Sequence, residues 1–415
     1  MSGSRSSRPE PPLIPTPLSW APSSLPCNPP AREHTDLEAT LSAGTARVGQ
    51  SSTNTAPHPT SLELPGLFEG ALRDFFDSRR ELVSTIGGGY EKAVSTLEAF
   101  VLRGGKRVRP SFAWTGWLGA GGDPNGKDAD AVIRACAALE LVQACALVHD
   151  DIIDASTTRR GFPTVHVEFE DQHRGQEWSG DSAHFGEAVA ILLGDLALAW
   201  ADDMIRESGI SPEAAARVSP VWSAMRTEVL GGQFLDISNE ARGDETVEAA
   251  MRVNRYKTAA YTIERPLHLG AALFGADAEL IDVYRTFGTD IGVAFQLRDD
   301  LLGVFGDPSV TGKPSGDDLI AGKRTVLFAM ALARADAADP AAAQLLRNGI
   351  GTQLTDNEVD SLRQAITDLG AVTDVETQID ALVEAAANAL DASTATAEAK
   401  SRLTDMAIAA TKRSY

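Results

Sequence analysis

Two acidic clusters in the sequence have the residue types and spacing of a site for divalent cations. The first is His149-Asp150-Asp151-Ile152-Ile153-Asp154, which follows a run of apolar residues. Residues four apart lie on one face of a helix, so Asp150 and Asp154 should point the same way, with Asp151 beside them. Carboxylates at a helix C-terminus repel one another and oppose the helix dipole, an arrangement that bound Mg²⁺ would stabilise. For this motif taken alone, a solvated acidic helix end is the alternative interpretation.

The second cluster is Asp299-Asp300, which lies within the apolar run 295–303. Gln296 precedes these aspartates by three and four residues, so it can share their helix face. Helical bundles commonly place metal sites between facing helices. Two acidic helices that face each other would therefore form a Mg²⁺ site for a diphosphate. The alternative interpretation is two unrelated acidic turns.

Basic residues accompany the acidic clusters, although the net charge of the chain is −21. Glycine allows the backbone to approach a ligand closely, and Lys and Arg bind phosphate oxygens. The basic segments are Gly104–Pro110 (GGKRVRP), Arg159-Arg160-Gly161, Lys257-Thr258, Lys313 and Gly322-Lys323-Arg324. Their positions beside acidic motifs favour phosphate binding over a purely solubilising role.

The elements that must position these groups are predicted to be helices. Apolar residues recur at helical spacing over 131–148, 188–204, 212–234, 280–305 and 375–390, and strand-like alternation is scarce. The pattern predicts one all-α domain over residues 61–415, larger than a four-helix bundle. Residues 170–187 are expected to form a polar loop in which His173 and His184 are solvated.

Composition excludes several other classes of protein. The strongly acidic charge argues against nucleic acid as a partner. No segment reaches the ~18 consecutive apolar residues of a membrane-spanning helix, and the N-terminus lacks a signal-peptide pattern. The three cysteines, Cys27, Cys136 and Cys145, are too few for a disulfide framework and fit a cytoplasmic enzyme.

Residues 1–60 differ in composition from the rest of the chain. They contain 11 of its 21 prolines and no lysine. Such a segment buries too little apolar surface to offset the entropy lost on ordering. We therefore expect a disordered N-terminal tail, with a start codon assigned too early as the alternative.

Together these motifs resemble the trans-isoprenyl diphosphate synthases, the family of farnesyl and geranylgeranyl diphosphate synthases. The general character of the sequence is most similar to that of the actinobacterial members. The resemblance covers roughly residues 66–413. It rests on five motifs in the family's order: GGKRVRP at 104–110, HDDIIDASTTRRG at 149–161, GGQFLD at 231–236, KT at 257–258, and FQLRDDLLGVFGDPSVTGKPSGDDLIAGKRT at 295–325.

The resemblance implies an all-α fold with a central cavity, about three Mg²⁺ ions and a homodimer. It implies an isopentenyl diphosphate site formed by Gly105, Lys106, Arg109, Gln143 and Arg160. It implies an allylic diphosphate site formed by Arg159, Lys257, Thr258, Gln296, Lys313 and Lys323. Asp150 and Asp154 would bind two Mg²⁺ ions and Asp299 a third, with Asp151, Asp300 and Asp317 in support. The sequence departs from the family at Gly303, where the second motif usually has a third aspartate, and this change would weaken the third metal site.

The expected reaction joins isopentenyl diphosphate to an allylic diphosphate such as dimethylallyl, geranyl or farnesyl diphosphate. Mg²⁺ and the cations, Lys257 and Lys313 among them, would stabilise the leaving diphosphate as the allylic C–O bond ionises. The double bond of isopentenyl diphosphate would attack the cation, and the released diphosphate would accept the proton. A dry cavity is needed because water would quench the cation.

Product length should depend on the side chains that precede Asp150 on its helix. In the family, bulky aromatic residues one turn before this motif stop growth at C15, whereas Cys145 and Ala146 are small. Val142 and Leu139 come next on that face and lie about 12–16 Å below Asp150 at ~1.5 Å rise per residue. This depth favours geranylgeranyl diphosphate (C20), with farnesyl diphosphate (C15) or products of C25 and above as alternatives.

Three other functions share part of this pattern. A class I terpene cyclase would have one aspartate-rich helix but no isopentenyl diphosphate site. A non-catalytic subunit of a heteromeric synthase would have lost more aspartates than the one replaced by Gly303. A metal phosphohydrolase with a His149-Asp150 pair would need further histidines, and the chain has only seven.

Overall fold

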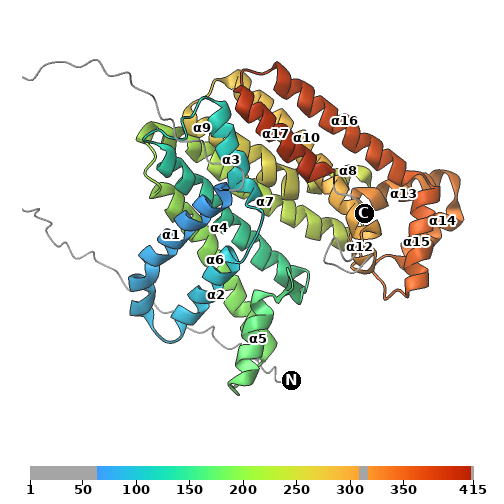
Figure 1. Cartoon of the computed structure of the whole chain (residues 1–415). Coiled ribbons are helices and arrows are strands. Elements are labelled where there is room, and N and C mark those ends of the chain that lie inside the picture. Colours follow the sequence, from blue (N-terminus) through green and yellow to red (C-terminus); the bar gives the residue numbers. More distant parts are fainter. Residues whose placement is uncertain (1–62, 308–315, 413–415) are drawn as a thin grey trace, which may run out of the picture. The chain divides into compact units, whose positions relative to one another are not determined.

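The computed structural model describes residues 63–307 and 316–412, and these are almost entirely helical (Figure 1). This confirms the predicted all-α class. Among the described residues, the strands are β1 (Thr158–Arg159) and β2 (Phe162–Pro163), which pair as a short antiparallel hairpin. The predictions for residues 1–60 and for Lys313 fall outside the described residues.

The first half of the described chain packs around one long apolar helix, α4. It contacts α1, α2, α3, α5 and α6, and its Leu139 and Val142 belong to the largest cluster of buried apolar residues. The helices of this half are α1 (Leu64–Ile86), α2 (Tyr90–Leu102), α3 (Val108–Gly119), α4 (Ala129–Ile153), α5 (Val165–Gly175), α6 (Ser182–Arg206) and α7 (Pro212–Arg242).

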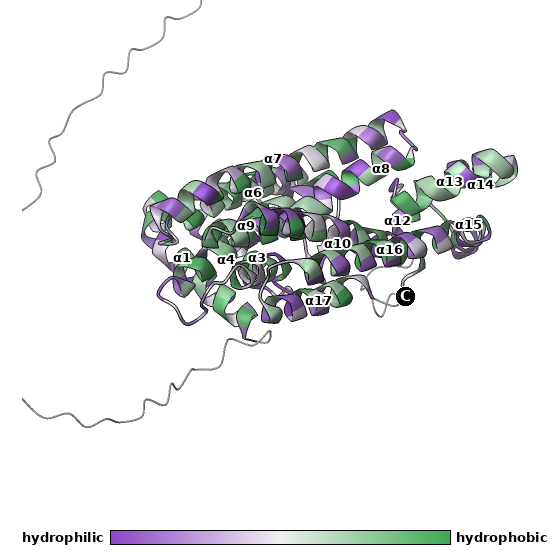
Figure 2. Cartoon of the chain, turned by 90° about the horizontal axis from the view of Figure 1, so that it is seen from above, coloured by the Kyte–Doolittle hydropathy of each residue, from purple (hydrophilic) through white to green (hydrophobic). Residues whose placement is uncertain are grey.

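The second half packs around α10, which lies against η1, α16 and α17 (Figure 1). Apolar and polar residues share these long helices, so each can bury one face and present another to solvent (Figure 2). The elements of this half are α8 (Val247–Val253), the π-helix η1 (Asn254–Glu264), α9 (Arg265–Phe274), α10 (Ala278–Phe305), α12 (Asp317–Ile320), α13 (Val326–Ala338), α14 (Pro340–Gly349), α15 (Asp356–Asp368), α16 (Ala371–Ala392) and α17 (Ala397–Thr411).

By length and hydropathy, α4 is the one helix of the described chain that could cross a membrane. Yet 78% of its most apolar window is buried inside the protein, as in the core helix of a globular domain. Its Cys136 and Cys145 are free and buried, and burial raises the pKa of the Cys145 thiol to about 12. Both cysteines are therefore inert core residues.

The prediction of a polar loop over residues 170–187 is wrong. Helix α5 continues to Gly175 and α6 begins at Ser182, so the connection is short. His173 is buried because its ring packs against Phe185 and Trp178, with centroids 5.2 and 5.9 Å away. These contacts join His173 on α5 to Phe185 on α6 and to Trp178 in the connection between them. A periodic apolar pattern along one helix does not predict such contacts. His184 is exposed, as expected.

Candidate active site

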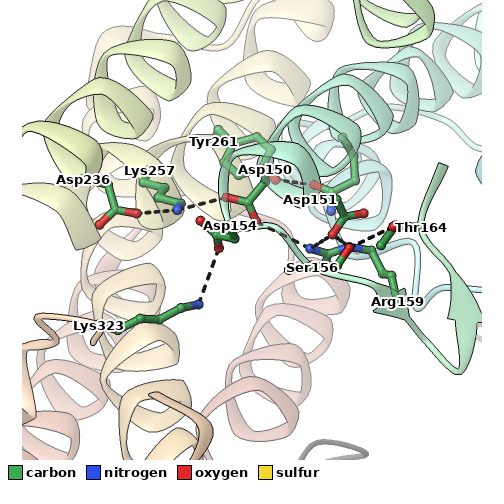
Figure 3. A network of polar contacts seen from close by, with 11 residues as sticks. Asp150, Asp151, Asp154, Ser156, Arg159, Thr164, Asp236, Lys257, Tyr261 and Lys323 are labelled. Atoms are coloured by element: carbon green, nitrogen blue, oxygen red, sulfur yellow. Dashed lines mark hydrogen bonds and ion pairs between the residues drawn. The ribbon is translucent and has the colours of Figure 1, made fainter. Parts of the chain in front are cut away.

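The first acidic motif ends α4, and two lysines from other elements neutralise it (Figure 3). Lys257 Nζ of η1 lies 3.1 Å from Asp150 Oδ1, and Lys323 Nζ lies 3.8 Å from Asp154 Oδ2. Burial raises the pKa of the Asp154 carboxyl, and the neighbouring Asp150 raises it further. Asp150 and Asp154 therefore share one face, as the four-residue spacing predicted.

Asp151 points away from this pair, toward the β-hairpin. Its Oδ1 accepts a hydrogen bond of 2.7 Å from Arg159 Nε, and Arg159 also reaches Asp150 at 3.5 Å (Figure 3). Burial raises the pKa of Asp151 in spite of this ion pair. Arg159 thus links the hairpin to the end of α4, and Asp151 orients that arginine.

A close contact between α7 and η1 positions Lys257. A Cβ on Gly232 would lie 2.2 Å from the Lys257 backbone nitrogen, so only glycine allows this approach. One helical turn later, Asp236 Oδ2 accepts a hydrogen bond of 2.5 Å from Lys257 Nζ. Burial lowers the pKa of Lys257, but Asp236 and Asp150 outweigh this effect, and the pKa lies well above its usual value. Thr258 beside it is half-buried.

Asp236 is a site residue that the sequence analysis did not assign. It belongs to the GGQFLD motif and lies four residues after Gly232, so one helix face carries both. That spacing could have identified it. The π-helical geometry of η1 could not be read from the sequence, although π-helical segments often mark functional sites.

Residues expected to bind isopentenyl diphosphate meet beside the first motif, around Tyr261. The Tyr261 hydroxyl donates to Gln143 Oε1, and the Arg109 guanidinium stacks on the Tyr261 ring with 3.9 Å to its centroid. Arg109 also donates to Thr262 Oγ1 at 2.9 Å. Arg109 and Gln143 are therefore brought together, and Tyr261 is a second residue that the sequence analysis missed.

The remaining residues expected at this subsite lie where the β-hairpin meets the glycine-rich loop. Arg160 donates to the Gly104 carbonyl at 3.3 Å, and a Cβ on Gly105 would lie 3.4 Å from the Arg160 guanidinium. Lys106 is exposed in the same loop. The structure thus places Gly105, Lys106 and Arg160 together.

The two aspartates of the second motif have different environments. Asp299 is exposed on α10, whereas Asp300 is buried. The Asp300 carboxylate accepts hydrogen bonds from Gln296 Nε2 at 2.9 Å and from the Val326 backbone at 3.2 Å. Burial raises the pKa of Asp300 to about 7. Asp300 and Gln296 therefore connect α10 to the start of α13, and Asp299 is the aspartate that faces solvent.

The space beyond Gly303 is filled by another carboxylate. A Cβ on Gly303 would lie 1.8 Å from Asp318 Oδ2. A third aspartate at this position would displace Asp318, which follows Asp317 at the start of α12. The Asp318 carboxylate therefore occupies the space that the side chain of a third aspartate at position 303 would enter.

The residues at the end of α4 fit Mg²⁺. In the part of the chain that the structure describes, no three His, Cys, Asp or Glu side chains are gathered as a ready-made metal site, and Asp299 is not brought into one group with Asp150 and Asp154. Mg²⁺ does not require such a cage, because it commonly binds one or two carboxylates plus water and substrate phosphates. Asp150 and Asp154 offer two carboxylates, and the Lys257 ammonium group beside Asp150 shows that this position attracts a cation.

An all-α bundle that gathers carboxylates, lysines and arginines at one helix end has the charged groups that a site for Mg²⁺ and a diphosphate requires. The model of the polyprenyl synthetase family matches residues 91–369. The chain is 35% identical over 293 residues to a geranylfarnesyl diphosphate synthase from Aeropyrum pernix (69% of this chain, 83% of the relative). It is 36% identical over 277 residues to a geranylgeranyl diphosphate synthase from Mycobacterium tuberculosis (66% of this chain, 72% of the relative).

A solved structure is also similar. It is the geranylgeranyl pyrophosphate synthase of Corynebacterium glutamicum, complexed with isoprenyl diphosphate and magnesium. Its TM-score is 0.81 at 49% identity, covering 85% of this chain and 99% of that one. This chain belongs to the polyprenyl synthetase family, as its motifs predicted. It is a trans-prenyl diphosphate synthase, and enzymes of this family use isopentenyl and allylic diphosphates.

Proposed function

We propose that this chain condenses isopentenyl diphosphate with allylic diphosphates in a Mg²⁺-dependent reaction, and that its main product is geranylgeranyl diphosphate. The observation that carries the proposal is the presence of two groups of cations beside one acidic helix end. Lys257, Lys323 and Arg159 contact Asp150, Asp154 and Asp151. The second group, Arg109 and Arg160 with Lys106, lies on the side of α3 and the hairpin.

Each group of cations has a separate task in this proposal. Lys257, Lys323 and Arg159 hold the allylic diphosphate and stabilise its charge as the C–O bond breaks. Arg109, Arg160 and Lys106 hold isopentenyl diphosphate so that its double bond faces the allylic carbon. Bound Mg²⁺ supplies further neutralisation of the diphosphate, and Asp150 and Asp154 are the residues that would hold it.

The test is turnover of the purified chain with Mg²⁺ and an allylic diphosphate, with and without isopentenyl diphosphate. We expect a longer prenyl diphosphate only when both substrates are present. Hydrocarbon released from the allylic substrate alone would indicate a terpene cyclase. No turnover by the chain alone, combined with turnover after a second subunit is added, would indicate a non-catalytic partner subunit.

The side chains along α4 support a C20 product. Leu139, Val142 and Cys145 are buried, and Ala146 is half-buried. Cys145 Sγ lies 3.7 Å from Nδ1 of His149, a residue that contacts the Ile191 carbonyl of α6. Ala146 precedes Asp150 by four residues and shares its face. Ala146 is therefore the first small side chain below the acidic motif on the face of Asp150.

Replacing Ala146 with phenylalanine should shift the main product from C20 to C15 without abolishing turnover, because the ring fills the space next to the growing chain. Cys145→Phe should shorten the product less, because its side chain turns toward α6. Cys145→Ala is the control and should leave product length unchanged. Chromatography of the dephosphorylated products checks this. A wild-type product of C15, or no shortening by Ala146→Phe, would contradict the proposal that small side chains before Asp150 allow growth to C20. A C25 product would show that chain growth stops further from Asp150 than proposed.

We also propose that the chain is a homodimer through α6 and α7. The two helices are joined by the short connection 207–211, and Asp202 on α6 accepts a hydrogen bond from Trp222 Nε1 on α7 at 3.0 Å. Leu192 on α6 and Phe234 on α7 are large apolar side chains that are 67% and 65% exposed. Ile191, Leu230 and Ile237 extend the exposed apolar surface. The family resemblance implies a homodimer, and we propose that a second copy covers this exposed apolar surface.

Leu192→Asp combined with Phe234→Asp should convert the dimer to a monomer, because four charges would enter an apolar interface. The control is Leu82→Asp with Ile86→Asp, which changes two exposed apolar residues of α1. Light scattering gives the mass of each. A monomeric wild-type chain, or a dimer that survives the α6–α7 change, would contradict the proposal.

A further inference from the structure

The loop that carries Lys106 has a backbone conformation that needs an anchor. Gly104, Gly105 and Arg107 all have positive φ values, of 69°, 116° and 48°. Glycine adopts such values without strain, whereas the Cβ of an L-residue clashes with its own backbone in the left-handed region. Arg107 is also the N-cap residue of α3, since its carbonyl accepts a hydrogen bond of 3.1 Å from the backbone nitrogen of Ser111. Contacts elsewhere must therefore hold Arg107 in place.

Those contacts come from the side chain of Arg107, which points into the protein. Its Nη1 donates to Glu140 Oε2 at 2.6 Å and to the Val101 carbonyl at 2.8 Å, and its Nη2 donates to Glu69 Oε1 at 3.3 Å. The side chains of Arg107 and Glu140 are 2% and 9% exposed. A guanidinium so deeply buried cannot contact a diphosphate bound beside Lys106. Of the three cations in GGKRVRP, Arg107 is the one turned inward.

The ion pair connects the loop to the helix of the first acidic motif. Glu140 lies ten residues before Asp150 on α4, a rise of about 15 Å at ~1.5 Å per residue. On its outer side, the loop meets the β-hairpin, where the Arg103 guanidinium lies 4.4 Å from the centroid of Phe162. The loop is thus held from both sides, and Arg107 forms its contact with the core.

We infer that Arg107 is a positioning residue, which with Glu140 sets the places of Lys106 and Arg109 for isopentenyl diphosphate. This inference rests on the proposed substrate of that subsite. Lys106 and Arg109 flank Arg107, so a shift of the loop would move both. In the part of the chain that the structure describes, Lys257 contacts Asp150 and Asp236 and makes no hydrogen bond or ion pair with Arg107. The affinity for the allylic diphosphate should therefore not depend on the pair.

The experiment measures the melting temperature and the KM of each substrate for wild type and for matched variants. Removing one partner leaves a buried charge unpaired, whereas replacing both with apolar residues of similar size is often neutral for stability. Arg107→Met combined with Glu140→Leu should therefore melt near the wild-type temperature. If Arg107 positions the loop, this variant should still raise KM for isopentenyl diphosphate by about 10-fold, with KM for the allylic substrate unchanged. Glu81→Gln, at an exposed residue of α1, is the control and should change neither KM.

Normal KM values for both substrates in a stable double variant would overturn the inference, and so would equal rises in both. If the double variant does not fold, Arg107→Lys decides, because it keeps the charge but not the forked geometry. It should raise only the KM for isopentenyl diphosphate. Wild-type turnover tests the proposed function separately. Calorimetric binding of isopentenyl diphosphate gives the ratio of variant to wild-type affinity without requiring turnover.

Discussion

Replacing Asp150 with alanine should lower turnover by at least ~10²-fold, the scale of losing a main electrostatic contact to the transition state. Asp150 lies between Lys257 and Arg159 at the end of α4, with distances of 3.1 and 3.5 Å. Its side chain is partly exposed and is not part of the apolar core. The helical circular dichroism should therefore persist. Steady-state kinetics and circular dichroism of the same preparation check both statements.

The control for this change is Asp130→Ala, an exposed aspartate in the first turn of the same helix. It should lose only a weak interaction with the helix dipole and keep its turnover. Chelation gives an independent test, since EDTA should abolish turnover and added Mg²⁺ should restore it. Near-normal turnover in EDTA would refute the metal dependence whatever the result with Asp150.

Lys257→Ala should also reduce turnover by about 10²-fold, because it removes the cation that lies between Asp150 and Asp236. The loss should appear mainly in kcat if Lys257 stabilises the leaving diphosphate rather than the bound substrate. The melting temperature should be recorded, because two carboxylates lose their partner. Lys92→Ala, an exposed lysine 3.9 Å from Glu168, is the matched control. If Lys257→Ala keeps its turnover within twofold of wild type, Lys257 does not stabilise the leaving diphosphate.

Much of the architecture is present in the sequence because helix formation depends on local periodicity. The apolar run 280–305 corresponds to α10, which begins two residues earlier, and 131–148 lies inside α4. The common face of Asp150 and Asp154 follows from their spacing alone. Where the contacts join separate elements, the pattern failed, as at His173, whose burial depends on rings from a neighbouring helix and loop.

The family and its acidic and basic motifs were thus determined by the order of residues, while the direction of individual side chains was decided by the tertiary structure. Lys106 and Arg107 are adjacent cations, yet one is exposed and the other buried against Glu140. Asp299 and Asp300 are also adjacent, yet Asp299 is exposed and Asp300 is buried, where it accepts a hydrogen bond from the Val326 backbone. Spacing along a helix predicts which residues share a face. It cannot predict which partner, from a distant part of the chain, comes within hydrogen-bonding distance of that face.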